Sequence, residues 1–312
     1  MKDYAILLYY CYTHIENPDE FREQHHYFCL SLNLFGRIII AEEGLNGTIS
    51  GLRADCEVYM TAIKADVRFA HTDFKVEYHD SHVFQKLYVR AKSEIVHAGL
   101  SHIKPLERTG KHLKPAEFKA MKDAEDVLIL DVRSNYEHQI GKFKNALTLN
   151  MDNFREFPEK VAELSAYKHK KVITYCTGGI KCEKASAYLL EQGFENVYQL
   201  EGGIIKYGIE AGGEDFEGKC YVFDGRITTD INTVNPVVIS KCYVCGTASD
   251  RMVNCANAAC NSHLAICEDC GNELDGACSL ACQIHPAKRV YDGTGYYQRE
   301  LNGYNPYLNV KR

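Results

Sequence analysis

Between Pro115 and Gly213, short apolar stretches alternate with helical ones, and this alternation constrains the fold more than any other feature of the sequence. Strands are expected at 127–130, 146–149, 171–175 and 197–200, and helices near 115–123, 135–140, 157–166 and 182–192. Strands that are apolar along their whole length are usually buried on both faces, as in a parallel sheet covered by helices. The sequence therefore predicts an α/β domain with a mostly parallel sheet over residues 115–213.

Residues 1–95 have a different order of elements. Strands are expected at 4–13, 36–41, 48–51 and 74–79, and helices at 18–33 and 53–67, with Asn46-Gly47 as a tight turn. This β-α-β-β-α-β order is typical of a ferredoxin-like α+β sandwich. The chain is thus expected to be an α/β multidomain protein, in which residues 96–114 form a basic linker and residues 214–312 a Cys-rich C-terminal module.

The six residues from Cys176 to Lys181 lie between the expected strand 171–175 and the following helix. Binding sites in open α/β sheets form at the carboxyl ends of strands, where this loop lies. Gly178 and Gly179 permit positive φ, so that backbone N–H groups can turn inward and bind an anion. The helix N-terminus and Lys181 add positive charge, which favours a thiolate. We predict a nucleophilic Cys176; the alternative is a structural cysteine in a glycine-rich turn.

Three further residues could support Cys176. Cys182 begins the following helix, where it could resolve an oxidised Cys176 or simply pack in the helix. Asp131 and Arg133 stand at the end of a neighbouring strand. They could orient the loop or bind substrate, or they could form a buried structural ion pair.

Eight of the fourteen cysteines fall into four close pairs: Cys242 and Cys245, Cys255 and Cys260, Cys267 and Cys270, Cys278 and Cys282. Without a recognisable secretory signal, clustered cysteines indicate metal ligands before disulfides. Eight thiolates suit two tetrahedral Zn²⁺ ions. The pairs could combine sequentially, or first with third and second with fourth, which we favour because it matches the two Cys-x₂-Cys pairs. Free or disulfide-bonded cysteines are the alternative, and His263 and His285 are possible substitute ligands.

Basic charge accumulates in two places although the formal net charge is −6. Seven basic residues between Lys86 and Lys114 face only Glu94 and Glu107, which indicates either a solvated connector or a strip that contacts phosphates. A second basic region begins at Lys288 and is interleaved with tyrosines. It suits an RNA loop, with tyrosines packed on the module as the alternative. Its members are Lys288, Arg289, Tyr291, Tyr296, Tyr297, Arg299, Tyr304, Tyr307, Lys311 and Arg312.

The first apolar run lacks a small-residue cleavage site, and we interpret it as a strand and not as a signal peptide. No apolar stretch approaches the ~20 residues that span a bilayer. The sequence thus predicts a cytoplasmic protein that makes no membrane contact.

Four segments resemble the successive signatures of rhodanese domains: Asp131–Arg133, Gly141–Ala146, Tyr175–Ser186 and Leu200–Gly203. Together with Ala41–Thr48, the third segment resembles the bacterial tRNA uridine(34) hydroxylase family, and the resemblance extends over essentially the whole chain, including Cys220–Asp224 and the Cys-rich tail. It implies that Cys176 is the active-site cysteine and carries a persulfide intermediate. Lys181 departs from the family, which usually has Arg there.

The resemblance implies an enzyme that uses molecular oxygen to convert uridine 34 in tRNA anticodon loops to 5-hydroxyuridine. The Cys176 loop alone suits equally well a sulfurtransferase that moves sulfur from thiosulfate or a persulfide donor. A zinc-bearing RNA-binding protein with a non-catalytic rhodanese domain is a third hypothesis. The sequence carries no flavin or nicotinamide fingerprint, so the oxygen chemistry follows from the resemblance alone.

Overall fold

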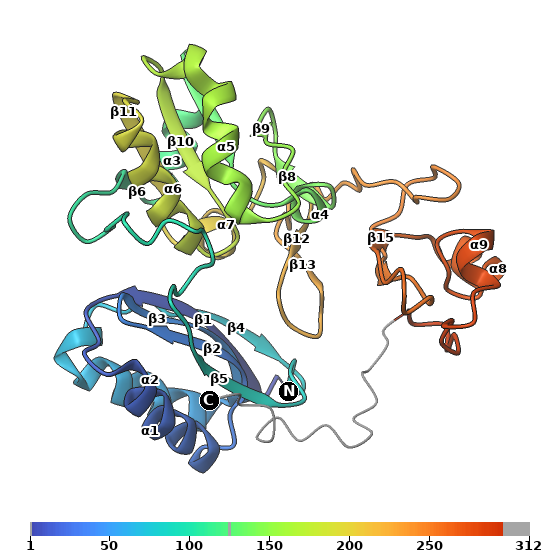
Figure 1. Ribbon diagram of the computed structural model, residues 1–312, viewed down its shortest axis with the longest axis horizontal. Helices are drawn as coiled ribbons and strands as arrows, with labels where there is room; N and C mark the ends of the chain where they lie inside the picture. The colour runs from blue at the N-terminus through green and yellow to red at the C-terminus, as the bar shows by residue number, and fades with distance from the viewer. Residues whose placement is uncertain (1, 124–125, 296–312) are drawn as a thin grey trace. The chain divides into compact units, whose positions relative to one another are not determined.

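The structure is a computed structural model that describes residues 2–123 and 126–295 (Figure 1). It divides into two compact units, Met1–Ile239 and Ser240–Arg312. The C-terminal module expected from residue 214 therefore corresponds to a compact unit that begins at Ser240. Residues 296–312 lie outside the described residues, and with them Tyr296, Tyr297, Arg299, Tyr304, Tyr307, Lys311 and Arg312 of the basic tail.

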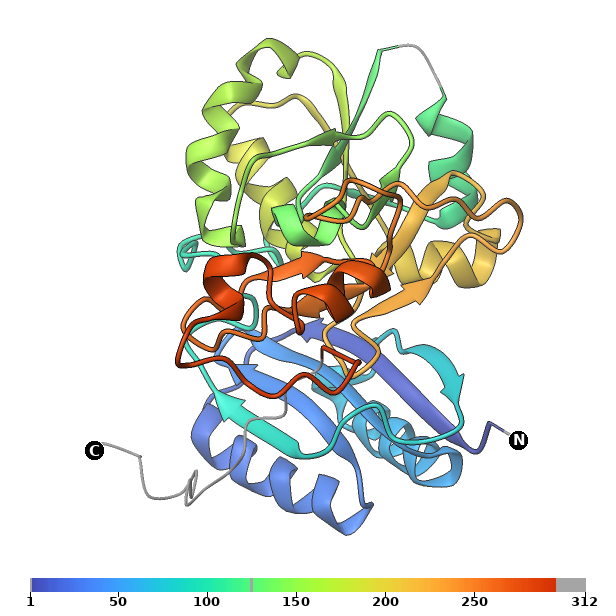
Figure 2. The same ribbon diagram turned by 90° about the vertical axis from the view of Figure 1, so that its right-hand side faces the viewer.

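The N-terminal domain is a mixed sheet in the order β4-β1-β3-β2-β5, with helices α1 and α2 on one face (Figure 2). This arrangement confirms the ferredoxin-like α+β sandwich, to which β5 adds a strand parallel to β2. The elements are β1 (Tyr4–Tyr12), α1 (Pro18–Ser31), β2 (Phe35–Ala41), β3 (Gly44–Leu52), α2 (Arg53–Ala65), a 3₁₀ turn at Val67–Phe69, β4 (Lys75–His79) and β5 (Leu87–Ala91).

Strand β1 divides its side chains between two cores. Leu7 and Tyr9 are fully buried in the core under α1 and α2. Because side chains alternate along a strand, Leu8, Tyr10 and Tyr12 point to the opposite face. On that face, Leu8 packs against the core of the central domain.

The central domain confirms the parallel sheet. Its strands lie in the order β6-β11-β10-β7-β9, and every neighbouring pair is parallel. The strands are β6 (Lys111–Leu113), β7 (Val127–Asp131), β9 (Leu147–Thr148), β10 (Lys171–Tyr175) and β11 (Asn196–Leu200). The helices are α3 (Pro115–Lys122), α4 (Asn135–His138), α5 (Phe157–Val161), α6 (Ile180–Glu191) and α7 (Gly203–Ala211), with 3₁₀ turns at Phe154–Glu156 and Ala162–Tyr167.

The stretch expected to be a linker is only partly one. Residues Lys111–Leu113 form the edge strand β6, which pairs with β11. Ala98, Leu100 and Ile103 are buried in the core of the central domain. These apolar side chains anchor the segment, while the lysines and arginines of the basic strip are exposed.

A short sheet completes the first unit. Strand β12 (Phe216–Tyr221) pairs antiparallel with β8 (Gly141–Phe143) and with β13 (Thr228–Asp230). The second unit contains the hairpin β14 (Met252–Asn254) and β15 (His263–Ala265), followed by α8 (Glu268–Glu273) and α9 (Leu280–Gln283). Among the described residues, no helix has the length and apolar character that a membrane span requires.

A buried ion triad joins the N-terminal and central domains. Lys184 on α6 is fully buried, and its ammonium lies 2.7 Å from Glu94 and 2.9 Å from Glu43. Glu94 also accepts the backbone N–H groups of Ala98, Gly99 and Leu100. Burial opposes ionisation of Glu94, but the hydrogen bonds from Lys184 and from these N–H groups lower its pKa. The triad is thus a charge cluster that requires all of its members.

Replacing Lys184 by Met should destabilise the first unit by about 3–5 kcal/mol, because two buried carboxylates lose their counter-charge. Urea unfolding measures the loss. The loss should shrink as the pH falls, since protonation of Glu94 removes an unpaired charge. Lys170→Met is the control: Lys170 pairs with Asp126 at the surface, and such a pair contributes about 1 kcal/mol or less. Equal losses in the two variants would contradict a structural role for the triad.

Candidate active site and cysteine clusters

Cys176 lies between the carboxyl end of β10 and the N-terminus of α6, as the sequence predicts, and its side chain is fully buried. The backbone N–H of Gly179 donates to Cys176 Sγ over 3.2 Å. Gly179 has φ +99°, a left-handed conformation that favours glycine. The N–H of Ile204 donates to the carbonyl oxygen of Cys176 over 3.0 Å, which fixes the loop to the start of α7.

The surroundings of Cys176 stabilise the thiolate. Burial by itself raises the pKa of this thiol, but the Cys182 hydrogen bond, the Lys181 charge and the N–H groups of Cys182 and Lys181 outweigh it and lower the pKa to about 7. Burial and the hydrogen bond to Cys176 raise the pKa of Cys182. Cys182 therefore serves as the thiol donor and Cys176 as the thiolate acceptor. A thiolate with this pKa is a nucleophile near neutral pH.

Gly178 differs from the expectation, because it does not adopt positive φ. A Cβ atom on Gly178 would lie 2.8 Å from Leu8 Cδ2, and one on Gly179 would lie 3.1 Å from the Tyr10 hydroxyl. Both glycines therefore allow strand β1 of the N-terminal domain to approach the loop closely. This approach explains why Cys176 has no exposed surface.

Asp131 and Arg133 are both fully buried and bind each other. Arg133 donates to both carboxylate oxygens of Asp131 and to the carbonyl oxygen of Gly141. The Tyr175 hydroxyl donates to Asp131 over 2.6 Å, so the pair holds the residue that precedes Cys176. This geometry favours the structural interpretation of Asp131 and Arg133, with an orienting effect on the loop through Tyr175.

Lys181 contacts a buried carboxylate. Its ammonium lies 2.6 Å from Glu137 Oε2, which also accepts the N–H of Ser134. Glu137 Oε1 is buried and has no hydrogen-bond partner among the described residues. The charge of Lys181 nevertheless reaches Cys176 and lowers its pKa.

The sequence did not reveal Glu183 as a centre of hydrogen bonds. Its carboxylate accepts bonds from Tyr10 in β1, from Thr109 and from Gln199 in β11, and it lies 2.8 Å from His112 in β6. Although burial opposes it, these contacts lower the pKa of Glu183, and they raise that of His112. The period-two alternation of β1, with Tyr10 on its outer face, is the sequence signal for this contact.

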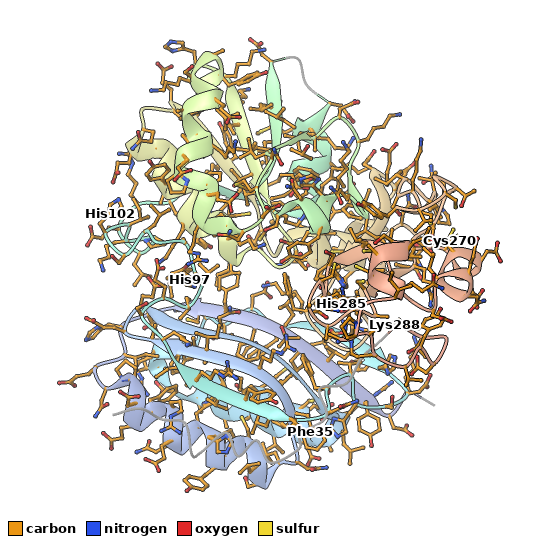
Figure 3. The ribbon with its side chains drawn as sticks, turned by 45° about the vertical axis from the view of Figure 1, so that its right-hand side comes forward. Phe35, His97, His102, Cys270, His285 and Lys288 are labelled. Atoms are coloured by element: carbon orange, nitrogen blue, oxygen red, sulfur yellow. The ribbon has the colours of Figure 1, made fainter. Side chains whose placement is uncertain are left out.

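The cysteines of the second unit gather in two groups of four. Within each group all sulfur atoms lie within 4.8 Å of one another. The groups combine first with third pair and second with fourth, which is the interleaved arrangement favoured above. His263 and His285 belong to neither group; His285 and Cys270 are labelled in Figure 3. The groups are Cys242, Cys245, Cys267 and Cys270, and Cys255, Cys260, Cys278 and Cys282. Four convergent thiols are a donor set able to hold a metal ion.

Comparisons with known proteins agree with this architecture. Residues 4–95 match the UPF0176 acylphosphatase like domain, residues 114–210 the rhodanese-like domain and residues 217–283 the rhodanase C-terminal model. The fold and the buried cysteine loop thus define a rhodanese-type domain joined to an acylphosphatase-like domain.

A tRNA uridine(34) hydroxylase of Cytophaga hutchinsonii is 69% identical over 312 residues, with 100% of both chains covered. Proteins of the same name from Enterococcus faecalis and Shouchella clausii are 48% and 46% identical and match 76% of both chains. The chain belongs to the tRNA uridine(34) hydroxylase family.

Among solved structures, a thiosulfate sulfurtransferase from Pseudomonas aeruginosa is 27% identical, with a TM-score of 0.30. The match covers 34% of this chain and 20% of that one, and it supports no functional inference.

Replacing Cys182 by Ala should raise the pKa of Cys176 by about one unit or more, because the thiolate loses a hydrogen-bond donor worth roughly 1.5–3 kcal/mol. The rate of iodoacetamide alkylation at Cys176, followed against pH by peptide mass spectrometry, should then rise at higher pH than in the wild type. Cys182→Ser, which keeps a donor, should shift the profile less. An unshifted profile in the Ala variant would exclude Cys182 as the donor.

Proposed function

We propose that this protein hydroxylates uridine 34 in tRNA to 5-hydroxyuridine, with Cys176 as the active-site cysteine. The observation that supports this most directly is a buried thiolate in the loop at the carboxyl end of β10, within a chain 69% identical to a tRNA uridine(34) hydroxylase over its full length. The enzyme class follows from the family. The lowered pKa of the Cys176 thiol and the Gly179 N–H that donates to its sulfur support the proposed role of Cys176.

Cys176 acts as a nucleophile or as the carrier of a persulfide, which the same N–H groups and the charge of Lys181 would stabilise as an anion. Molecular oxygen is the proposed co-substrate. Replacing the C5–H of uridine by C5–OH uses one oxygen atom of O₂. Reduction of the other atom to water takes two electrons and two protons from an external donor.

The tRNA anticodon loop is the proposed substrate, and the exposed cations of the basic strip supply contacts to its phosphates. Arg108, Lys111 and Lys114 are all exposed on the segment that connects the two domains of the first unit. Lysine and arginine neutralise phosphates without reading sequence, so this strip would position the RNA. A tRNA substrate also supports the proposal of a cytoplasmic location.

The two cysteine groups are proposed to bind one Zn²⁺ ion each. Zinc favours four thiolates in tetrahedral geometry, and the ions would stabilise a unit with few regular elements. The proposed role is structural, since each group supplies four protein ligands and leaves no open position for substrate.

Cys176→Ser should abolish 5-hydroxyuridine in tRNA while leaving the folded state intact, because a hydroxyl is neither a nucleophile near neutral pH nor a persulfide carrier. Nucleoside mass spectrometry of tRNA from a deletion strain complemented with each variant measures the product. Cys11→Ser is the matched control, since burial raises the pKa of Cys11 and keeps it a thiol. Wild-type product levels in Cys176→Ser would overturn the proposed role. A thiosulfate–cyanide assay on the same proteins tests the sulfurtransferase alternative.

Protein purified without chelator should contain two Zn²⁺ per chain, measured by plasma mass spectrometry. Cys267→Ser should lower the zinc content and the melting temperature, because the free energy of metal binding is also folding free energy. Cys56→Ser, at a buried cysteine of the N-terminal core outside both groups, should keep both ions. Metal content near zero in the wild type would refute the zinc assignment.

A further inference from the structure

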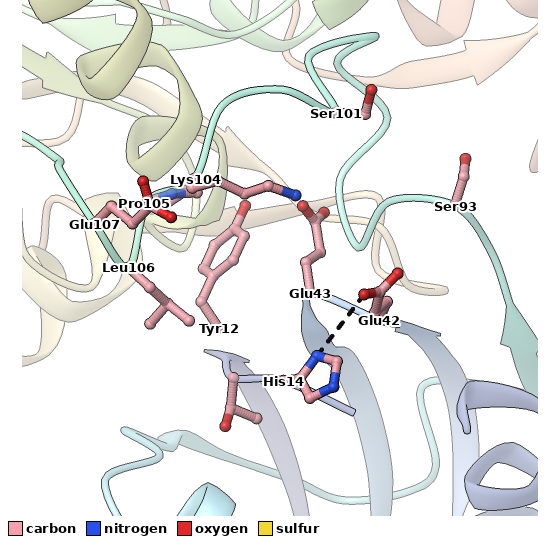
Figure 4. A pocket seen from close by; sticks show the side chains of 11 residues that line it. Tyr12, His14, Glu42, Glu43, Ser93, Ser101, Lys104, Pro105, Leu106 and Glu107 are labelled. Atoms are coloured by element: carbon pink, nitrogen blue, oxygen red, sulfur yellow. Dashed lines mark ion pairs between the residues drawn. The ribbon is translucent and has the colours of Figure 1, made fainter. Parts of the chain in front are cut away.

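A cavity of about 380 Å³ opens beside the end of β1 (Figure 4). Its walls come from the end of β1, from the turn between β2 and β3, and from the segment 93–107. Tyr12, Glu43, Ser93, Ser101, Lys104 and Leu106 are among its lining residues. The proposed reaction does not use this cavity, whose lining includes Lys104 of the basic strip.

Two donors in the cavity lack partners. The Tyr12 hydroxyl is buried and has no hydrogen-bond partner within residues 2–123 and 126–295. Lys104 forms no ion pair with the residues that the structure describes, and Figure 4 shows its side chain reaching over the cavity towards Tyr12 and Glu43. A buried polar group without a partner costs free energy, and native proteins avoid this cost unless a ligand or water completes the bond. The Tyr12 hydroxyl is therefore available to donate to a ligand in the cavity.

The cavity also supplies an acceptor. Glu43 binds Lys184 through Oε2 and the N–H of Ile95 through Oε1, so its side chain is held in place. A carboxylate oxygen has two lone pairs, and each Glu43 oxygen keeps capacity for a further donor. Burial and the negative charges of Glu43 and Cys176, among others, raise the pKa of Tyr12, so its hydroxyl stays protonated and able to donate.

This set of groups discriminates between uracil and cytosine. The Watson–Crick edge of uracil presents an N–H between two carbonyl oxygens. The carboxylate of Glu43 can accept the N–H, while Lys104 and Tyr12 can donate to the carbonyl oxygens. Cytosine has an amino group in place of one carbonyl and no N–H at the ring nitrogen, so it would face the carboxylate with a lone pair. Leu106 adds an apolar contact for the face of a base, as splayed RNA bases require.

The cavity is connected to the cysteine loop by a single strand face. Leu8, Tyr10 and Tyr12 alternate along β1 and point to the same side. Leu8 and Tyr10 lie against the glycines that follow Cys176, and the rings of Tyr10 and Tyr12 are 6.2 Å apart. The cavity at Tyr12 therefore lies next along β1 to the two side chains that cover the cysteine loop.

We propose that this cavity binds a uracil base of the RNA loop, with Tyr12 and Lys104 donating to its carbonyl oxygens and Glu43 accepting its N–H. The inference rests on the proposed function for the identity of the RNA. The chemistry of the cavity discriminates against cytosine, and the choice of uracil over guanine, whose ring N–H and carbonyl oxygen fit the same groups, also rests on the proposed function. Tyr12 and Lys104 are binding residues in this assignment and do not touch the reacting thiolate.

The test is the binding of uridine 5′-monophosphate and cytidine 5′-monophosphate to the full-length protein, measured by ligand-observed NMR titration. Uridine monophosphate should bind more tightly than cytidine monophosphate. Lys104→Met should weaken it by about tenfold and Tyr12→Phe by several-fold, as expected for loss of a charged and a neutral hydrogen bond. Lys171→Met is the matched control, because Lys171 is exposed at the opposite end of β10 from Cys176.

Three outcomes would overturn the assignment: no binding of uridine monophosphate, equal affinity for the two nucleotides, or an affinity for uridine monophosphate that neither Lys104→Met nor Tyr12→Phe lowers. Alkylation of Cys176 at neutral pH should remain at the wild-type rate in Tyr12→Phe, which separates a binding effect from damage to the thiolate.

The proposed function is tested separately, by 5-hydroxyuridine formation in the wild type. If the wild type modifies tRNA while the variants bind nucleotide normally, only the cavity assignment fails. If nucleotide binding behaves as expected without tRNA modification, only the proposed function fails.

Discussion

The burial of an ammonium group at Lys184 is the constraint on which the rest of the first unit depends. A buried charge is tolerated only with counter-charges in place, and Glu43 and Glu94 supply them from outside the central domain. The same helix turn carries Lys181 and Cys182, which stabilise the thiolate, and Glu183, which binds Tyr10. One turn of α6 therefore holds the N-terminal domain and sets the reactivity of Cys176. Because the same turn does both, removing either domain would disturb the domain contact and the surroundings of Cys176 together.

Covering the cysteine loop has an electrostatic consequence. Leu8 and Tyr10 exclude water from the glycines beside Cys176, and in a site without water the N–H groups and the Lys181 charge act with less screening. Desolvation alone would favour the neutral thiol, so the lowered pKa of Cys176 shows that the fixed dipoles and charges outweigh it. Cys29 gives the contrast, since burial is the cause that raises its pKa to about 12. Burial by itself makes a cysteine inert.

The features that local patterns determine were predictable from the sequence. Most of the order of strands and helices in both domains, the loop around Cys176 and the interleaved cysteine groups follow from periodicity or spacing. The exceptions are strands β5 and β8, which were not predicted, and the turn expected at Asn46-Gly47, which lies inside β3. The segment 96–114 was expected to be a linker because its charges dominate its composition. Its strand β6 depends on the register with β11, in which Leu113 pairs with Leu200, and such long-range pairing leaves no local signal. The contact of Leu8 and Tyr10 with the loop around Cys176 was not predicted for the same reason, since about 170 residues separate these side chains from the loop.

Lys181 supports the Cys176 thiolate through its charge and contacts one oxygen of the Glu137 carboxylate. An arginine would offer two parallel N–H groups to both oxygens of a carboxylate, whereas a lysine reaches one of them as a point charge. The contacts of Glu137 are those expected for a lysine: Oε2 binds Lys181, while Oε1 is buried without a partner in the described part of the chain. The field at Cys176 depends on charge and distance, which lysine preserves, and not on the second hydrogen bond. Lys181 therefore leaves one oxygen of Glu137 without a partner among the described residues, while its charge still supports the thiolate.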